Sequence, residues 1–71
     1  MTDERQRKLL GKKVRELRLK NGLTQEEMRD HGFGYWYYQR IEAGEKDLRL
    51  STLNCLANTF KVSIVELFDF D

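Results

Sequence analysis

Residues 33–42 place a dense group of aromatic side chains directly before a glutamine, an arginine and a glutamate, in the sequence FGYWYYQRIE. Arginine can bind guanine O6 and N7 with two hydrogen bonds, and glutamine can pair with adenine in the same way. Tryptophan and tyrosine can pack against thymine methyl groups or donate a single hydrogen bond. Aromatic residues also build the core of a small chain, so the question is which of these side chains are buried and which bind a ligand.

The distribution of charge is compatible with a polyanionic ligand. The formal net charge of the chain is only +1, but residues 1–40 carry +4 and residues 41–71 carry −3. A basic part beside an acidic part suits a protein that contacts a polyanion with one side. A solvated helix surface without any ligand would show the same charges, so both interpretations stay open at this point.

Length and residue content argue against several other classes. A chain of 71 residues forms one domain, residues 1–71, and gains stability from a partner chain. Its one cysteine, Cys55, cannot form an internal disulfide, and with one histidine, His31, we expect no metal site. The charged N-terminus is unlike a secretory signal and no apolar run is long enough for a membrane helix, so we expect a cytoplasmic protein with no membrane contact. Nothing in the sequence indicates a cofactor or a small-molecule ligand.

Helix signals follow one another along the chain. Leu10, Val14 and Leu17 form one apolar stripe on a first helix predicted over residues 4–20, and Gly22 suits the left-handed position after its end. A second helix opens at the sequence TQEE, in which Thr24 and Glu27 have the spacing of a capping box.

The second half of the chain continues this pattern. A third helix is predicted over residues 35–42 and Gly44 stops it. Ser51 or Thr52 is expected to cap a fourth helix, and Ser63 with Glu66 to open a last one that runs to about residue 69. No segment alternates as a strand does, so the sequence predicts an all-α domain of five short helices.

Three segments of the chain form a recognisable pattern: VRELRLKNGLTQEEM, YYQRIEAGE and LSTLNCLANTFKVSIVELF. Together they resemble the Cro/cI (XRE-like) helix-turn-helix family of DNA-binding domains, and the resemblance covers about residues 9–68. It implies a five-helix, lambda-repressor-like domain whose recognition helix, about residues 35–42, lies in the DNA major groove. The function implied is that of a small stand-alone transcriptional regulator, such as a repressor, which acts by occupying a specific double-stranded DNA operator. Restriction-modification controllers, phage repressors and antitoxins are all small proteins of this type, and the sequence does not choose among them.

The resemblance also implies roles for the aromatic stretch. Phe33, Tyr38 and Ile41 match inward positions of the family. The residues implied to contact bases are Tyr35, Trp36, Gln39 and Arg40. The alternative for Tyr35 and Trp36 is that they shield one edge of an undersized core.

Further residues match positions that contact the DNA backbone in the family. Phosphate contacts add affinity without sequence information. The implied set is Thr24, Gln25, Tyr37, Lys46, Arg49 and Ser51. Gln25 matches a glutamine that contacts phosphate in the family, although Thr24 and Gln25 could simply form a capped helix start. Glu45 and Asp47 in the loop after the recognition helix oppose such a contact.

Arg18 and Glu42 match an arginine and a glutamate that pair between the first and third helices of the family. We expect this ion pair to be structural. The sequence offers no nucleophile or metal set to accompany Glu42, so we do not expect an enzyme.

The sequence departs from the family pattern around the second helix. The interval from Gln25 to Ile41 is one residue short, and the small residue that lets the two helices approach is missing. Counting places either Met28 or Arg29 in that position; we prefer Met28, because burying an arginine is costly. This choice makes His31 a partly buried residue.

The last helix predicts a homodimer. Ile64, Leu67 and Phe68 can share one face and close the core. Val65 and Phe70 then have no place in the monomer, and the expected dimer surface consists of Val65, Phe68 and Phe70. A two-fold dimer would read a palindromic operator with its recognition helices about 34 Å apart.

A different class of function stays open. The aromatic third helix on a helix-turn-helix scaffold could bind another protein, because aromatic residues and arginine also dominate protein interfaces. Salt dependence separates the two, since only binding through several phosphates weakens steeply as salt rises.

Overall fold

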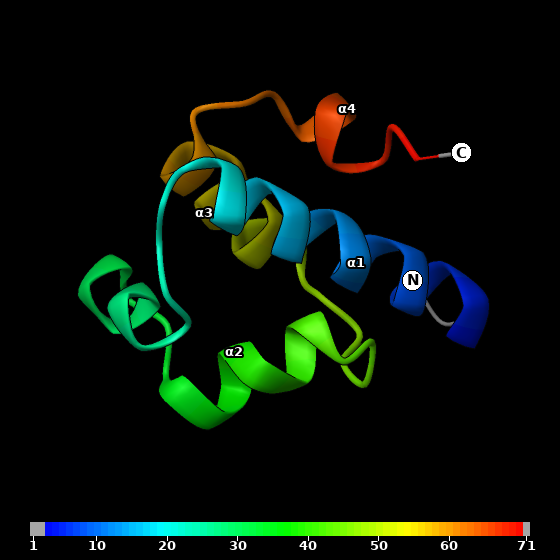
Figure 1. The fold of residues 1–71 in the computed structure, drawn as a ribbon. Coiled ribbons are helices and arrows are strands. Elements are labelled where there is room, and N and C mark those ends of the chain that lie inside the picture. Colours follow the sequence, from blue (N-terminus) through cyan, green and yellow to red (C-terminus); the bar gives the residue numbers. More distant parts are fainter. Residues whose placement is uncertain (1–2, 71) are drawn as a thin grey trace.

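The computed structural model describes residues 3–70, and throughout these residues the regular structure is helical (Figure 1). The elements in chain order are α1 (Glu4–Lys20), the 3-10 helix η1 (Glu26–His31), α2 (Tyr35–Glu42), α3 (Leu50–Phe60) and α4 (Ile64–Leu67). The prediction of an all-α domain with five helices is confirmed. No helix in this range is long and apolar enough to cross a membrane.

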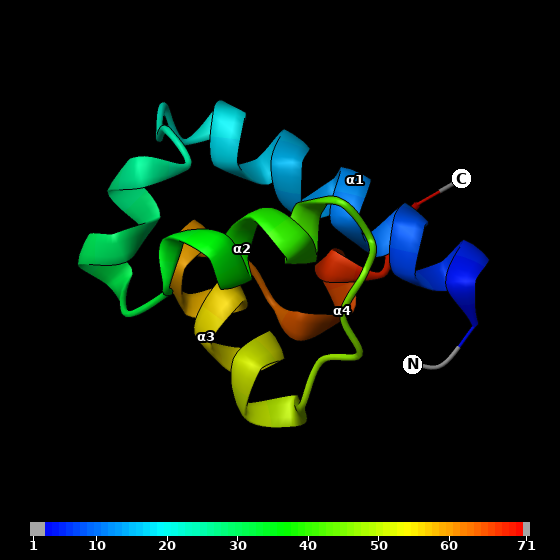
Figure 2. The ribbon, with the colours of Figure 1, turned by 90° about the horizontal axis from the view of Figure 1, so that it is seen from below.

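Helix α1 forms the centre of the arrangement. It contacts α2, α3 and α4. Figure 1 shows α2 on one side of α1 and α4 on the other, and Figure 2 shows α2 alongside α1 from below. Asp3 caps its beginning by accepting a hydrogen bond from the amide of Arg5 at 3.0 Å. The predicted stripe of Leu10, Val14 and Leu17 is buried, so α1 supplies the wall against which the other helices pack.

The segment after α1 opens as predicted but winds more tightly. Thr24 Oγ1 accepts a hydrogen bond from the amide of Glu27 at 3.1 Å, and Glu27 Oε1 accepts one from the amide of Thr24 at 2.9 Å. This capping box leads into the 3-10 helix η1. A 3-10 helix rises about 2.0 Å per residue, compared with about 1.5 Å in an α-helix. The segment that is one residue short therefore rises more per residue than an α-helix would.

Met28 is the inward residue of η1. Its side chain is fully buried, whereas Arg29 is exposed, so the choice of Met28 over Arg29 is confirmed. The prediction of a partly buried His31 is wrong, because its side chain is exposed. The ring of Phe33, which is buried, closes the core at this point instead.

Helix α2 has the predicted bounds. Gly34 precedes it in extended backbone without a side-chain cap, and Gly44 follows its end with φ of +75°. Tyr38 and Ile41 are buried, and the ring of Tyr38 meets the edge of Phe33 with centroids 5.7 Å apart. The inward side of α2 is thus filled by the residues expected there.

Two features of the last helices differ from the prediction. Helix α3 begins at Leu50 after the extended backbone of Arg49. Ser51 and Thr52 lie within its first turn, so neither caps it. Helix α4 ends at Leu67 rather than near residue 69, and beyond it Phe70 packs partly against the core. Only half of the capping box forms, with Ser63 Oγ accepting from the amide of Glu66 at 3.3 Å.

Helix α1 and the end of α2 meet backbone to backbone at Gly11. A Cβ atom at Gly11 would lie 2.6 Å from the carbonyl oxygen of Glu42 and 2.7 Å from that of Ile41. A Cβ atom at Gly44 would lie 2.7 Å from the Cα atom of Lys8. These distances are below any normal contact, so both glycines are needed for α2 to lie this close to α1. Gly11 was not predicted from the sequence to have this role.

Candidate nucleic-acid interface

The outward side of α2 carries the side chains that were expected to contact bases. Trp36 is 70% exposed and Arg40 is exposed, while Tyr35 and Gln39 are half-buried. Tyr38 and Ile41 occupy the inward side of the same helix. The structure therefore brings Tyr35, Trp36, Gln39 and Arg40 to one surface and separates them from the aromatic core.

The two neighbouring aromatics of this surface support each other. The rings of Tyr35 and Trp36 meet edge to face, with centroids 5.2 Å apart and an interplanar angle of 75°. Such contacts stabilise an aromatic pair by about 0.5–1.5 kcal/mol beyond area burial. Tyr35 thus restricts the indole ring, but most of the Trp36 surface stays open to solvent.

The loop after α2 contacts this helix and α1. The Nζ atom of Lys46 lies 5.8 Å from the centroid of the Tyr37 ring, within the range of a cation–π interaction. Arg7 lies 3.6 Å from the carboxylate of Asp47, and its Nε donates to the carbonyl of Gly44 at 3.3 Å. The charge of Asp47 is therefore paired with α1.

The remaining residues expected at the DNA backbone lie at the surface as well. Arg49, Ser51 and Thr24 are exposed, and Lys46 is half-buried. The Thr24 hydroxyl already accepts the capping bond from Glu27, but its own proton can still be donated.

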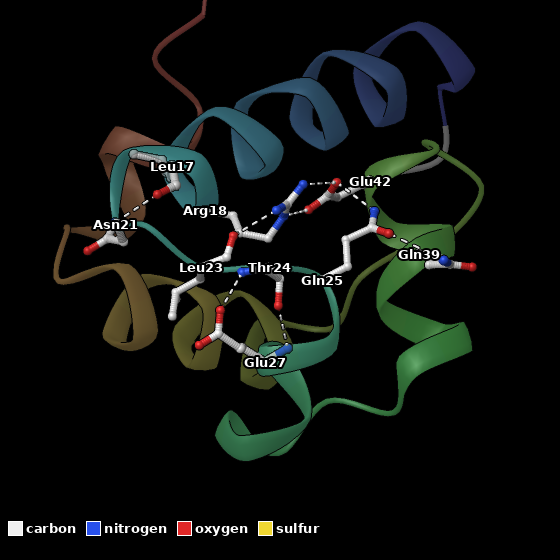
Figure 3. A network of polar contacts seen from close by, with 9 residues as sticks. All are labelled: Leu17, Arg18, Asn21, Leu23, Thr24, Gln25, Glu27, Gln39 and Glu42. Atoms are coloured by element: carbon white, nitrogen blue, oxygen red, sulfur yellow. Dashed lines mark hydrogen bonds and ion pairs between the residues drawn. The ribbon is translucent and has the colours of Figure 1, made fainter.

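A buried ion pair joins α1 to the end of α2. Arg18 Nε donates to Glu42 Oε2 at 2.7 Å, and its Nη2 lies 3.4 Å from Oε1 (Figure 3). The two side chains are only 8% and 5% exposed. Arg18 Nη1 also donates to the carbonyl of Leu23 at 2.7 Å. The hydrogen bonds to Glu42 raise the pKa of the Arg18 guanidinium. The pair therefore fixes the end of α2 relative to α1 and to the chain that enters η1.

The ion pair continues into two glutamines. Gln25 Nε2 donates to Glu42 Oε1 at 3.0 Å, and Gln39 Nε2 donates to Gln25 Oε1 at 3.2 Å (Figure 3). A chain of polar contacts thus runs from buried Arg18 to Gln39 on the outward side of α2. Gln25 and Gln39 were expected in separate roles, and their contact was not predicted from the sequence.

The Tyr38 hydroxyl is the buried polar atom of this region without a hydrogen-bond partner among the described residues. Burial, and then the nearby carboxylate of Glu42, raise the pKa of this hydroxyl. The phenol therefore stays neutral beside the ion pair.

Arg15 is a basic residue of this surface that the sequence analysis missed. It is exposed on α1 and lines an open hollow that it shares with Gln25, Gln39, Arg40 and Glu45. Its position follows only from how α1 packs against α2. Its charge adds to that of Arg40, and Glu45 partly offsets it.

The C-terminal surface is apolar. Val65 is 78% exposed and Phe68 is 36% exposed, and the Phe68 ring lies 6.3 Å from that of Phe70. We expected Phe68 to close the core and Phe70 to lie outside it. That expectation is wrong, because α4 ends early, so Phe68 remains at the surface and Phe70 folds back onto the core.

The described residues include no cluster of three or more histidine, cysteine or acidic side chains that could hold a metal ion. Cys55 is an exposed free thiol whose Sγ lies 4.0 Å from the carbonyl oxygen of His31. The arrangement on α2 offers hydrogen-bond donors, acceptors and apolar rings for binding.

Comparisons with known proteins agree with this fold. A family model described as Helix-turn-helix matches residues 14–67. The chain is 42% identical over 62 residues to the uncharacterised HTH-type transcriptional regulator y4dJ of Sinorhizobium fredii (strain NBRC 101917 / NGR234), covering 86% of this chain and 80% of that protein. It is also similar to the crystal structure of the restriction-modification controller protein C.AhdI from Aeromonas hydrophila. The TM-score is 0.80, with 31% identity over 86% of this chain and 94% of that one. The chain thus belongs to the XRE-like helix-turn-helix family.

Proposed function

We propose that this protein is a sequence-specific DNA-binding transcriptional regulator that inserts α2 into the major groove. The observation that carries the proposal is the outward side of α2. It exposes Trp36 and Arg40, while a buried ion pair fixes the end of the helix. Two relatives, a transcriptional regulator and a restriction-modification controller, support the same function. Catalysis, cofactors and small-molecule ligands have no part in it.

The side chains of α2 divide by the chemistry that they can offer to bases. Arg40 presents a guanidinium fork that matches guanine O6 and N7. Gln39 presents an amide that can pair with adenine. Trp36 and Tyr35 present apolar rings, for which thymine methyl is the apolar partner in the major groove.

A second set surrounds α2 and would hold the phosphate backbone. The members are Thr24, Tyr37, Lys46, Arg49 and Ser51, to which we add Arg15. Gln25 was expected in this set, but its amide is engaged by Glu42 and Gln39, so we do not assign it to the phosphate backbone. Of the assigned residues, Arg15 and Arg49 are exposed cations and would add affinity for any duplex sequence. Asp47 repels the phosphate backbone less than its charge alone would indicate, because Arg7 pairs with it.

We further propose that the protein acts as a homodimer on a palindromic operator. The support is the exposed apolar side chains of Val65 and Phe68. Val65 lies in α4 and Phe68 directly follows it, and α4 lies on the side of α1 away from α2 (Figure 1). A single recognition helix reads few base pairs, whereas a two-fold dimer reads two half-sites.

Selection of bound sequences from random duplex DNA, followed by titration at several salt concentrations, tests the function. We expect one enriched, two-fold symmetric sequence. Its affinity should fall with salt with a slope of about −0.9 per phosphate contact on a log–log plot. Absence of any enriched sequence at low salt would contradict DNA reading. It would favour instead a protein partner for the exposed ring of Trp36, whose binding should depend only weakly on salt.

A further inference from the structure

The hydrogen bonds between Glu42, Gln25 and Gln39 have a fixed direction. The carboxylate of Glu42, paired with a guanidinium, can only accept. Gln25 must therefore turn its NH₂ group toward Glu42, as the bond of 3.0 Å from Nε2 to Oε1 requires. The other end of the same amide, Oε1, then faces Gln39.

The direction passes on to Gln39. The Gln25 oxygen can only accept, so Gln39 must turn its own NH₂ group toward it, and the two atoms lie 3.2 Å apart. Figure 3 shows the Gln39 oxygen pointing away from Gln25. Among the described residues this oxygen accepts no hydrogen bond. It is the free acceptor at the end of the chain of contacts.

The beginning of the chain is rigid. Arg18 holds both oxygens of Glu42, and the carbonyl of Leu23 holds Arg18 in turn. The side chains of Arg18 and Glu42 are almost fully buried. The buried carboxylate of Glu42 therefore determines, through Gln25, which end of the Gln39 side-chain amide faces outward. A free glutamine in water could present either end to a base.

We propose that Gln25 is a positioning residue for base specificity, because it engages one N–H of the Gln39 amide and so holds the Gln39 oxygen free and turned outward. This inference rests on the proposed DNA-binding function and names what Gln39 reads. The matching base is one that offers an exocyclic amino group in the major groove, which is adenine or cytosine. Guanine and thymine present only acceptors at the corresponding atom. The role differs from a phosphate contact, which would leave base preference unchanged.

Three variants test the inference, with selection of bound sequences as the readout. Gln39→Ala first identifies the base pair whose preference depends on Gln39. Gln25→Met, similar in size but without an amide, should then lower the preference at that pair from about tenfold to within about twofold. Preference at the pair read by Arg40 should stay unchanged, which controls for a general loss of fold. The double variant should behave as Gln39→Ala alone, because Gln25 acts through Gln39.

Gln25→Lys gives the sharper result. An ammonium group can only donate, so it can bond Glu42 and the oxygen of Gln39 together. Gln39 would then turn its NH₂ group outward, and the preferred base should change from adenine or cytosine to guanine or thymine. Because the added charge raises affinity for all DNA, the measure is the ratio between bases within one variant.

Two results would overturn the inference while leaving the proposed function intact. One is a Gln25→Met protein that loses the same factor on every sequence. The other is a Gln25→Lys protein with the base preference of the wild type. A wild-type protein without any sequence preference would overturn the proposed function itself.

Discussion

Around α2, polar contacts with fixed partners add to the burial of Tyr38 and Ile41, whereas α4 is held mainly by apolar contacts and leaves part of its surface uncovered. On the first side, Arg18, Glu42 and Gln25 join α1, α2 and the chain before η1 through hydrogen bonds of 2.7–3.0 Å. On the second side, Leu67 is fully buried while Val65 is 78% exposed on the same short helix.

The difference follows from what each side has to do. Hydrogen bonds depend on direction, so they can set the orientation of a helix and of a single amide. Apolar burial is roughly proportional to area and has no direction, so it can hold α4 in place without fixing a polar group. A surface that distinguishes bases needs the first kind of contact, and one that joins two copies of a chain can use the second.

The largest effect on stability is expected when the Arg18–Glu42 ion pair is broken. Glu42→Ala leaves the guanidinium of Arg18 buried without its partner. Removing one member of a buried pair destabilises a protein by roughly 3–5 kcal/mol, a large part of the stability of a small domain. Urea unfolding of the variant and of the wild type measures this difference.

Two further variants control this experiment. Glu45→Ala removes an exposed carboxylate just beyond the same helix and should change stability little. The double variant Arg18→Met, Glu42→Leu should be more stable than Glu42→Ala, because no buried charge is left unpaired. A Glu42→Ala protein as stable as Glu45→Ala would show that the ion pair does not hold α2.

The close contact between α1 and α2 gives the next effect. In an ordinary helix, Gly→Ala stabilises by up to about 1 kcal/mol. At Gly11 the added methyl would meet two carbonyl oxygens at 2.6 and 2.7 Å, so we expect Gly11→Ala to destabilise by about 1–3 kcal/mol. Gly22→Ala is the comparison, since it meets no atom within 4 Å and bears only the strain of φ +71°. Thermal unfolding that shows Gly11→Ala to be stabilising would contradict the contact.

The contrast between the two sides also explains what the sequence could predict. Local signals were sufficient for α1 and α2, because the apolar stripe of α1 and the glycines flanking α2 act on neighbouring residues. The choice of Met28 over Arg29 also succeeded, since burial of a charge is costly whatever the fold. The family resemblance placed Arg18 opposite Glu42, and the two lie in contact in the structure.

Features that depend on distant packing were missed. Gly11 has meaning only once the end of α2 lies on it, and Arg15 joins the surface only through the same packing. The contact between Gln25 and Gln39 depends on side-chain direction, which sequence spacing does not specify. The places of Phe68 and Phe70 were wrong because the end of a short helix is decided by packing rather than by propensity.

Substitution of Arg40 tests whether the outward side of α2 contacts DNA bases. It is exposed on α2, so Arg40→Ala should not lower stability. We expect a loss of roughly 1–3 kcal/mol in operator affinity, with relaxed preference at one G·C pair in each half-site. Titration against operator and random duplexes measures both. A loss that is equal on all sequences would assign Arg40 to the phosphate backbone.

The apolar side is tested through Val65. Val65→Ala removes exposed apolar area from α4 and should leave the monomer folded, while it weakens dimerisation by about tenfold. Leu50→Ala is the matched control, because Leu50 is an apolar residue of similar exposure outside this surface. Sedimentation at micromolar concentration gives the association constant. A wild-type protein that stays monomeric there would contradict the dimer.

The smallest effect is expected at the capping box that begins the polar side. Hydrogen bonds from the amide and then the hydroxyl of Thr24 lower the pKa of Glu27. A carboxyl group whose pKa is lower in the folded protein stabilises the fold above its unfolded pKa of about 4.3, and this contribution is lost as the pH falls through the lowered value. Glu27→Gln keeps an acceptor for the Thr24 amide but does not titrate in this range. The stability difference between wild type and Glu27→Gln should therefore be constant above about pH 5 and should shift against the wild type as the pH falls toward 3. Urea unfolding between about pH 3 and pH 7 measures this stability difference.

Glu26→Gln is the control, because it removes an exposed carboxylate next to Glu27. Parallel pH profiles of stability for all three proteins would show that the capping bond does not stabilise η1.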